Sequence, residues 1–277
     1  MLSGEVVNTS ERLAANHTAL RSPGGHTELN RLTAIAERVR DGSLLGSSGK
    51  PINAIVSLGI GGSHLGPAMA FDALRHSCHQ EITVRFSSGL DGTEIMSALG
   101  GLDAAATLFI ICSKSLTTAE TLTTFETAKD WLKSNGINNL VCHFAAATSN
   151  PERAIAIGID PELIFIIPAT VGGRFSLPTA TSLALMIAIG PEAFTSLLAG
   201  MHEIDCHLAE TPIEKNVPMI LGLLDVWHRS FLNMTSRVVV PYSYGLRNFP
   251  AYLQQLTMES LGKSAVSYTH LTLPTKA

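Results

Sequence analysis

Short apolar runs alternate with amphipathic stretches between residues 50 and 168. The runs are rich in β-branched and aromatic residues and have the length of buried strands. They cover residues 52–59, 83–88, 107–113, 141–147 and 163–168. Between them, apolar residues recur at helical spacing in residues 66–77, 92–102, 117–136 and 150–158. This alternation predicts an α/β fold with a doubly wound parallel sheet that helices cover on both faces.

The pattern changes after residue 173. Residues 174–190, 191–211 and 212–234 read as three successive helices. The apolar run RVVVPYS at 237–243 predicts one more strand, and 246–263 predicts a final helix. A single strand and helix in this place indicate the start of a second α/β unit.

Composition supports a compact globular enzyme. The 277 residues are 45% hydrophobic and 15% charged, with a net charge of −4, so no basic surface indicates nucleic-acid binding. Neither a signal peptide nor an apolar run of membrane-spanning length is recognisable, so we expect a cytoplasmic protein without membrane contact. The four cysteines lie far apart without metal-ligand spacing, which predicts reduced thiols and neither a metal site nor a disulfide framework.

The stretch SLGIGGSHLGP at 57–67 places four glycines directly after a predicted strand. Ligands of open α/β sheets bind at such strand ends, beside helix N-termini. A dinucleotide-binding loop would need glycine at His64, a nucleophile elbow would need it at Leu65, and a Walker A loop would need a Gly-Lys pair. Two readings remain: backbone N–H groups and the Ser63 hydroxyl hold an anion or polyol, or the stretch is a tight turn without a ligand.

The next strand end carries hydroxyl groups and one lysine. They belong to Ser113, Lys114, Ser115, Thr117, Thr118 and Thr121. Donors and positive charge at a helix N-terminus suit a phosphate monoester. The alternative is an ordinary N-cap followed by threonines on an exposed helix face. The clustering favours phosphate.

Together these motifs resemble the glucose-6-phosphate isomerase family, whose members contain two sugar-isomerase (SIS) domains. The resemblance rests on GIGGSHLGP, SSGLDGTEI, SKSLTTAET, GIDPE, VGGRFSLPTATSLA, TPIEKNVPMILGLL and AYLQQLTMESLGK. These segments follow the family's order and cover residues from about 5 to 264. VGGRFS and QQLTMES are highly specific to the family.

The resemblance implies a set of site residues and no cofactor or metal. Ser63 lies by the sugar, and Gly173 and Arg174 flank the reacting carbons. Gln255 and Glu259 complete the site. The phosphate pocket consists of Ser113, Lys114, Ser115, Thr118 and Thr121. The activity implied is the glycolytic and gluconeogenic interconversion of glucose 6-phosphate and fructose 6-phosphate.

The chemistry of that reaction agrees with these residue types. An aldose becomes a ketose when one base moves a proton between adjacent carbons through an enediolate. Glu259 is the expected base, Gln255 shares its helix face, and Arg174 supplies charge to the enediolate oxygen. Taken singly, Glu259 reads as a solvated surface carboxylate, and the alternative reading of Arg174 is a structural ion-pair partner. The rival interpretation is a non-catalytic SIS-type sugar-phosphate-binding module, which needs neither residue.

The chain departs from the family pattern in three places. His64 follows GGS where the family usually has an acidic residue, IIPAT precedes VGGR in place of an aromatic-rich segment, and Leu261 follows MES where asparagine is common. These departures bear on substrate preference more than on reaction type.

Family members are much longer, so we expect this chain to be truncated at both ends. The expected division is an N-terminal helical segment (1–49), a first SIS domain (50–190), a helical connection with the start of a second, incomplete SIS domain (191–264), and a non-native tail (265–277). No position matches the family's ring-opening histidine or C-terminal lysine. We therefore expect an incomplete catalytic set and little activity from the chain alone, whereas the full-length parent is expected to be a homodimer.

Overall fold

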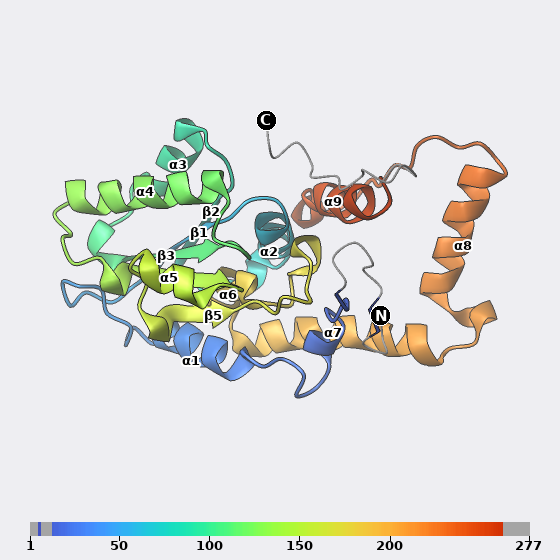
Figure 1. The fold of residues 1–277 in the computed structure, drawn as a ribbon, viewed down its shortest axis with the longest axis horizontal. Helices are drawn as coiled ribbons and strands as arrows, with labels where there is room; N and C mark the ends of the chain where they lie inside the picture. The colour runs from blue at the N-terminus through green and yellow to red at the C-terminus, as the bar shows by residue number, and fades with distance from the viewer. Residues whose placement is uncertain (1–4, 7–12, 263–277) are drawn as a thin grey trace.

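The computed structural model describes residues 5–6 and 13–262 and contains one five-stranded parallel sheet. Its strands are β1 (Ala54–Leu58), β2 (Thr83–Ser87), β3 (Thr107–Cys112), β4 (Phe144–Thr148) and β5 (Ile164–Ile166). The order is β2-β1-β3-β4-β5 (Figure 1). The expected α/β class and all five strands of this sheet are confirmed. The tail expected at 265–277 lies outside the described residues, as do 1–4 and 7–12.

Helices cover both faces of the sheet, as the sequence predicts (Figure 1). α1 (Leu29–Arg40), α2 (Gly62–Ala73) and α6 (Leu183–Ile189) pack on one face, with α7 (Pro191–Glu210) outside them. The other face carries α3 (Gly92–Leu99), α4 (Ala119–Ser134) and α5 (Pro151–Ala156). Alternate strand residues supply the two cores: Leu108 and Ile110 face the first set, and Phe109 and Ile111 face the second.

The central helix α6 is apolar on all sides. All seven of its residues are buried, which fits a helix enclosed by other elements. Its C-terminal carbonyl groups are reached by a side chain of α1: Arg40 Nη1 donates to the carbonyl oxygens of Ile187 at 2.8 Å and Ala188 at 3.1 Å. A guanidinium therefore satisfies carbonyl groups that the helix itself leaves without partners.

The strand order creates a switch point between β1 and β3. From β1 the chain passes to the edge strand β2, and it then returns to place β3 on the other side of β1. Ligands of doubly wound sheets bind beyond the carboxyl ends of the strands at such a point. The glycine stretch after β1 and the hydroxyl-rich loop after β3 both lie there.

Residues 174–190 do not form the single helix expected from their apolar content. They contain two short 3-10 turns, η6 (Gly173–Phe175) and η7 (Ala180–Ser182), before α6 begins. Pro178 disfavours helical geometry at the residue before it. Side-chain hydroxyl groups also compete with the helical hydrogen bonds for backbone carbonyl groups. Thr179 Oγ1 donates to Ser176 O at 2.7 Å, and Ser182 Oγ donates to Leu177 O at 2.6 Å.

Two further expectations need correction. α2 begins at Gly62, one turn before the helix expected from residue 66, and Pro67 lies inside it. Residues 237–243 do not form the expected strand in the described part of the chain. Val238 and Val240 are 78% and 64% exposed. A β-branched run forms a strand only beside a strand to which it can bond, because β-propensity depends on its surroundings.

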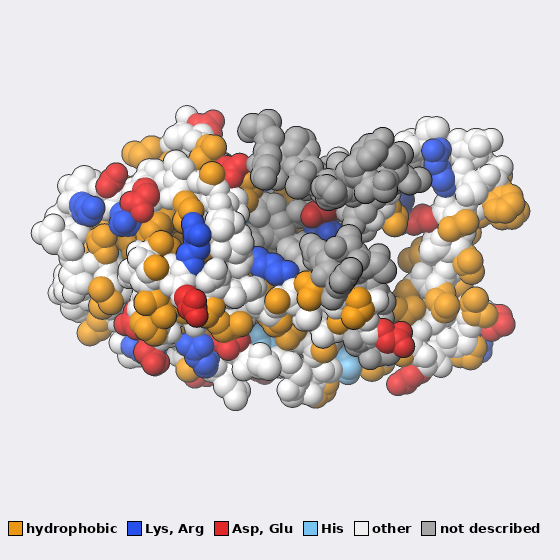
Figure 2. All heavy atoms as spheres, in the orientation of Figure 1, with side chains coloured by type: hydrophobic (Ala, Val, Ile, Leu, Met, Phe, Trp, Pro, Cys, Tyr) orange, Lys and Arg blue, Asp and Glu red, His pale blue; other side chains and the backbone are white. Residues whose placement is uncertain are grey.

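The last helices differ in how they contact the body. α9 (Phe249–Leu261) packs against α2, whereas α8 (Val217–Ser230) stands beyond the far end of α7 (Figure 1). No residue of α8 is buried, and apolar side chains lie along it (Figure 2). None of the helices in the described part is long and apolar enough to cross a membrane.

The exposed apolar surface of α8 predicts self-association of the purified 277-residue chain. Leu223 and Trp227 are 56% and 51% exposed and lie one turn apart. We expect Leu223→Lys/Trp227→Lys to lower the weight-average mass in sedimentation velocity. The matched control is Ser48→Lys/Asn138→Lys, which adds the same charge at exposed sites away from α8. Equal mass for both double variants would refute a role for α8.

Candidate functional site

The glycine stretch after β1 packs tightly against three other segments. A Cβ atom on Gly59 would lie 3.0 Å from Cys112 Cβ at the end of β3. Gly61, the N-cap of α2, has φ +58°, which favours glycine, and a Cβ there would lie 3.2 Å from Gln255 Nε2 of α9. The turn therefore touches both the β3 end and α9.

The closest approach in this turn is between backbones. A Cβ on Gly62 would lie 2.2 Å from the carbonyl carbon of Gly173, so no larger residue fits without displacing the loop after β5. Ser176 Oγ also donates to Gly62 O at 3.1 Å. The glycines thus join the turn to the VGGR segment, and Ser63 follows them in the first turn of α2.

Four of the expected phosphate residues, Ser113, Lys114, Ser115 and Thr118, lie in the loop from β3 to α4, and Thr121 lies in the first turn of α4. Ser113 is buried at the end of β3; its Oγ accepts from Leu116 N at 3.2 Å and lies 3.4 Å from Thr118 Oγ1. Ser115 Oγ lies 2.6 Å from Thr117 Oγ1. Leu116 has φ +50°, an uncommon conformation for a residue with a Cβ. The hydroxyl groups of Ser113, Ser115, Thr117 and Thr118 thus lie just before α4, and Thr121 follows in its first turn.

Two threonines of this cluster keep hydrogen-bonding capacity. Thr118 is the N-cap of α4, but its side chain makes no capping bond. Thr121 Oγ1 is buried without a partner among the described residues. Lys114 points elsewhere: its Nζ donates to Ala169 O at 2.7 Å, in the loop after β5. The loop therefore offers hydroxyls and the first N–H groups of α4 to an anion.

Arg174 and Glu259 meet at the other side of the glycine turn. Arg174 Nη1 lies 3.5 Å from Glu259 Oε1, and Arg174 Nε donates to Ser260 Oγ at 2.8 Å. The arginine and glutamate side chains are 19% and 30% exposed, so the pair is partly desolvated. The guanidinium also lies over the Phe175 ring, 4.9 Å from its centroid.

Two polar atoms of α9 point into this region unpaired. Glu259 Oε2 and Gln255 Oε1 are buried and lack hydrogen-bond partners among the described residues. Because the two residues are four apart on one helix, they share a face. Arg174, Glu259 and Gln255 thus lie near the glycine turn, and the described part of the chain leaves one carboxylate oxygen and one amide oxygen there without partners. In the described part, no group of three or more His, Cys, Asp or Glu side chains is arranged to hold a metal ion.

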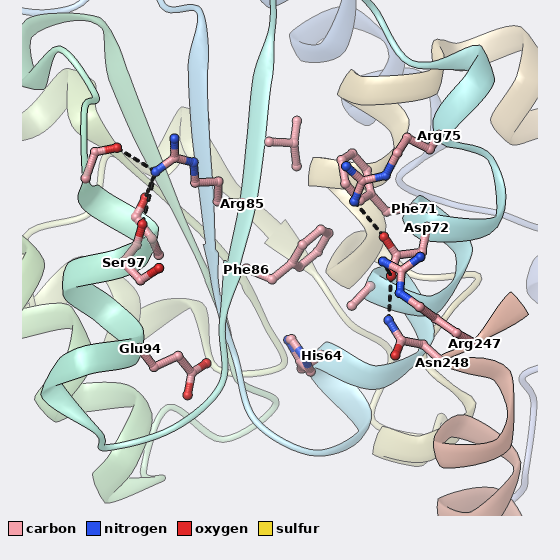
Figure 3. A pocket seen from close by; sticks show the side chains of 14 residues that line it. His64, Phe71, Asp72, Arg75, Arg85, Phe86, Glu94, Ser97, Arg247 and Asn248 are labelled. Atoms are coloured by element: carbon pink, nitrogen blue, oxygen red, sulfur yellow. Dashed lines mark hydrogen bonds and ion pairs between the residues drawn. The ribbon is translucent and has the colours of Figure 1, made fainter. Parts of the chain in front are cut away.

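A separate cavity of about 780 Å³ lies along the edge strand β2, between α2 and α3 (Figure 3). Its lining includes His64 but none of the expected site residues. His64 packs edge-on against Phe86, with ring centroids 5.9 Å apart. Burial lowers the pKa of His64, and the nearby Glu94 carboxylate opposes this in part. The residue at the position where the family usually has an acid therefore faces this cavity.

The N-terminal segment supports the loop that contains VGGR (residues 171–174). The sequence pattern did not predict this contact. His17 is 5% exposed and stacks on Phe175 at a centroid distance of 4.5 Å. Burial, followed by the charges of Arg21 and Arg174, lowers the pKa of His17 to about 4. No motif marked His17. Ser260, the other omission, belongs to the quoted MES motif, so its contact with Arg174 had a sequence signal.

Comparison with known proteins shows the family to which this chain belongs. A family model described as phosphoglucose isomerase matches residues 1–273. The chain belongs to the phosphoglucose isomerase family. The resemblance seen in its motifs is therefore confirmed over nearly all of the sequence.

Relatives within the phosphoglucose isomerase family are consistently longer. A glucose-6-phosphate isomerase of Deinococcus deserti is 46% identical over 95% of this chain and 51% of its own length. Glucose-6-phosphate isomerase 3 of Rhodococcus jostii is 47% identical over the same shares. A crystal structure of a glucose-6-phosphate isomerase from Chlamydia trachomatis has a TM-score of 0.82 and 30% identity, covering 95% of this chain and 52% of that one. The chain spans about half the length of the relatives it matches.

The contact between Gly62 and Gly173 predicts a sharp difference between two glycines. Gly62→Ala is expected to lower the free energy of unfolding by about 1–3 kcal/mol, because the new methyl group overlaps the backbone of Gly173. Gly200→Ala in α7 meets no atom within 4 Å and is expected to raise it by up to about 1 kcal/mol. Urea unfolding followed by circular dichroism compares them. Equal stability of the two variants would contradict the contact.

Buried histidines predict lower stability in acid. The pKa of His17 is about 4 in the folded state and 6.5 as the ordinary value, so the unfolded chain binds the proton more readily. The free energy of unfolding should fall as pH drops from about 6.5 to 4, by at most about 1.4 kcal/mol per pH unit for one histidine.

Denaturant unfolding at several pH values checks this dependence. His17→Phe keeps an aromatic ring against Phe175 and should flatten the slope, whereas His76→Phe, at an exposed site, should leave it unchanged. A slope in His17→Phe equal to that of the parent chain would show that His17 does not contribute.

Proposed function

We propose that the site interconverts glucose 6-phosphate and fructose 6-phosphate, using Glu259 as the base and Arg174 as the cation beside the reacting carbons. One observation carries the proposal. Glu259 is paired with Arg174 through Oε1, while its Oε2 is buried and has no hydrogen-bond partner within residues 5–6 and 13–262. The names of the relatives support an aldose-ketose isomerase.

In the proposed reaction, Glu259 takes the proton from C2 of the open-chain aldose and returns it to C1. The electron pair of the C2–H bond forms the enediolate double bond, and the hydroxyl proton on O2 passes to O1. Arg174 stabilises the negative charge that develops on oxygen, because its guanidinium is always protonated. Gln255 contributes its amide on the same helix face.

The phosphate group is proposed to bind at the loop from β3 to α4. Ser113, Ser115, Thr118 and Thr121 supply hydroxyl groups, and α4 supplies its positive N-terminal dipole. Lys114 is included as the local positive charge, since its Nζ donates to the neutral carbonyl of Ala169. The glycine turn with Ser63 would then lie along the sugar, between this loop and Gly173.

We further infer that this chain alone binds the sugar phosphate but turns it over poorly. The family's ring-opening histidine has no matching position here. Ring opening would then rest on the small open-chain fraction of the sugar in solution. Homodimer formation is proposed for proteins of the relatives' full length.

A thermal-shift titration tests the binding part of this proposal. Fructose 6-phosphate at a hundredfold excess over its Kd should stabilise the chain by about 2.7 kcal/mol. Inorganic phosphate at the same concentration should stabilise it less. Thr118→Ala should weaken the binding of both ligands, because it removes a hydroxyl group that contacts the phosphate. Thr123→Ala, an exposed threonine of the same helix, is the matched control. Equal effects of the two variants would contradict the assigned phosphate loop.

Solvent deuterium incorporation into fructose 6-phosphate tests the proton transfer. Proton NMR should show slow exchange at C1 that Glu259→Gln abolishes. Binding without deuterium incorporation would instead favour the non-catalytic sugar-phosphate-binding module.

A further inference from the structure

Helices α2 and α9 form an antiparallel pair with contacts at three levels. At one end, Gly61 lies against Gln255; in the middle, a Cβ on Gly66 would lie 3.3 Å from Tyr252 Cε2. At the other end, Asp72 bonds to Asn248, the N-cap of α9. The end of the pair near Gln255 therefore belongs to the candidate site, and the opposite end does not.

The three α9 contacts and Glu259 share one helical stripe. Asn248, Tyr252, Gln255 and Glu259 are spaced at i, i+4, i+7 and i+11, which places them on one face. A shift of α9 by one residue would rotate this face by about 100° and move it along the axis by about 1.5 Å. The register at Asn248 thus determines where Gln255 and Glu259 lie.

Asp72 makes the directional bonds at the remote end. It is buried, and both carboxylate oxygens are engaged (Figure 3). Oδ1 accepts from Arg75 Nη2 at 2.7 Å, within α2. Oδ2 accepts from Arg247 Nη2 and from Asn248 Nδ2, at the start of α9. One carboxylate therefore joins the two helices through two charge-assisted bonds.

Apolar packing of α9 on the core involves Tyr252 and the partly buried side chains of Phe249 and Leu256. Tyr252 is its single buried residue within the described part of the chain. Hydrophobic contact is non-directional, so it permits sliding and rotation that hydrogen bonds to a fixed carboxylate do not. Directional bonds hold α9 near both ends. Arg174, in the loop after β5, bonds to Ser260 and pairs with Glu259, whereas the network at Asp72 ties the start of α9 to α2.

We propose that Asp72 is a positioning residue that fixes the register of α9 on α2 and thereby places Gln255 and Glu259 beside the glycine turn and Arg174. It acts through α9 and does not touch the substrate. This inference rests on the proposed function for its consequence in sugar-phosphate binding, but the register itself does not depend on that function.

The ligand test compares variants across and within the helix pair. Asp72→Asn and Arg247→Gln should weaken fructose 6-phosphate binding about tenfold or more, because misplacement of binding groups by about 1 Å has large effects. Inorganic phosphate, whose proposed loop lies on α4, should keep its Kd within about twofold. Arg75→Gln is the matched control, because Arg75 bonds the same carboxylate without reaching α9.

The coupling should appear in a double-mutant cycle measured by calorimetry. Asp72→Asn/Arg247→Gln should bind fructose 6-phosphate no more weakly than the worse single variant, because both remove one link. Loss of phosphate and sugar-phosphate binding in equal proportion would show a general structural role and overturn the proposal. An effect of Arg75→Gln as large as that of Arg247→Gln would overturn it as well.

Hydrogen exchange separates this inference from the proposed function. Amides of residues 249–261 should exchange faster in Asp72→Asn and Arg247→Gln than in the unsubstituted 277-residue chain or in Arg75→Gln. Exchange of the α4 amides should stay unchanged. If the unsubstituted chain binds fructose 6-phosphate no better than inorganic phosphate, the proposed function fails. Hydrogen exchange in α9 then tests the role of Asp72 in the helix register by itself. Unchanged exchange in α9 for both variants would overturn the positioning role.

Discussion

The candidate site depends on one close contact between backbones, that of Gly62 with the carbonyl of Gly173. The carbonyl carbon stands 2.2 Å from where a Cβ of residue 62 would be, so the contact excludes every side chain. Through it, the turn after β1 meets the loop that carries Arg174. The same turn touches the end of β3 at Cys112 and the helix α9 at Gln255. Backbone freedom at the end of a buried strand therefore serves tight packing among four segments.

Helix α2 connects this contact to the rest of the molecule. Its first turn contains the glycine contacts, its middle packs on Tyr252, and its last turn holds Asp72. Its inner face belongs to the same core as α6 and the sheet. The position of Glu259 therefore depends on how α9 packs on α2, which in turn packs on the sheet. Tyr252 is the one residue of α9 that is buried in the described structure. A site supported in this way keeps its geometry with few direct contacts of its own.

The loop with Arg174 is supported from its other side by the N-terminal segment. His17 stacks on Phe175, and Asn16 N donates to Thr170 O at 3.2 Å. Arg21 pairs with Asp205 of α7 at 2.9 Å, in a partly buried ion pair. These contacts join residues that are more than 150 positions apart. A segment that precedes the sheet thus contributes to the surroundings of Arg174.

Local pattern determined much of this protein. The alternation of strands and helices predicted the class of fold, because the spacing of apolar residues along the sequence differs between strands and helices. Ser113, Thr118, Arg174 and Glu259 stood out through motif and residue chemistry, and the strand ends indicated where the loops would meet. Only the tertiary structure decided that residues 237–243 form no strand here, that Gly62 faces Gly173, and that Asp72 and His17 support the site. Those outcomes depend on which distant segments pack together, and packing between distant segments leaves no periodic signal in a single sequence.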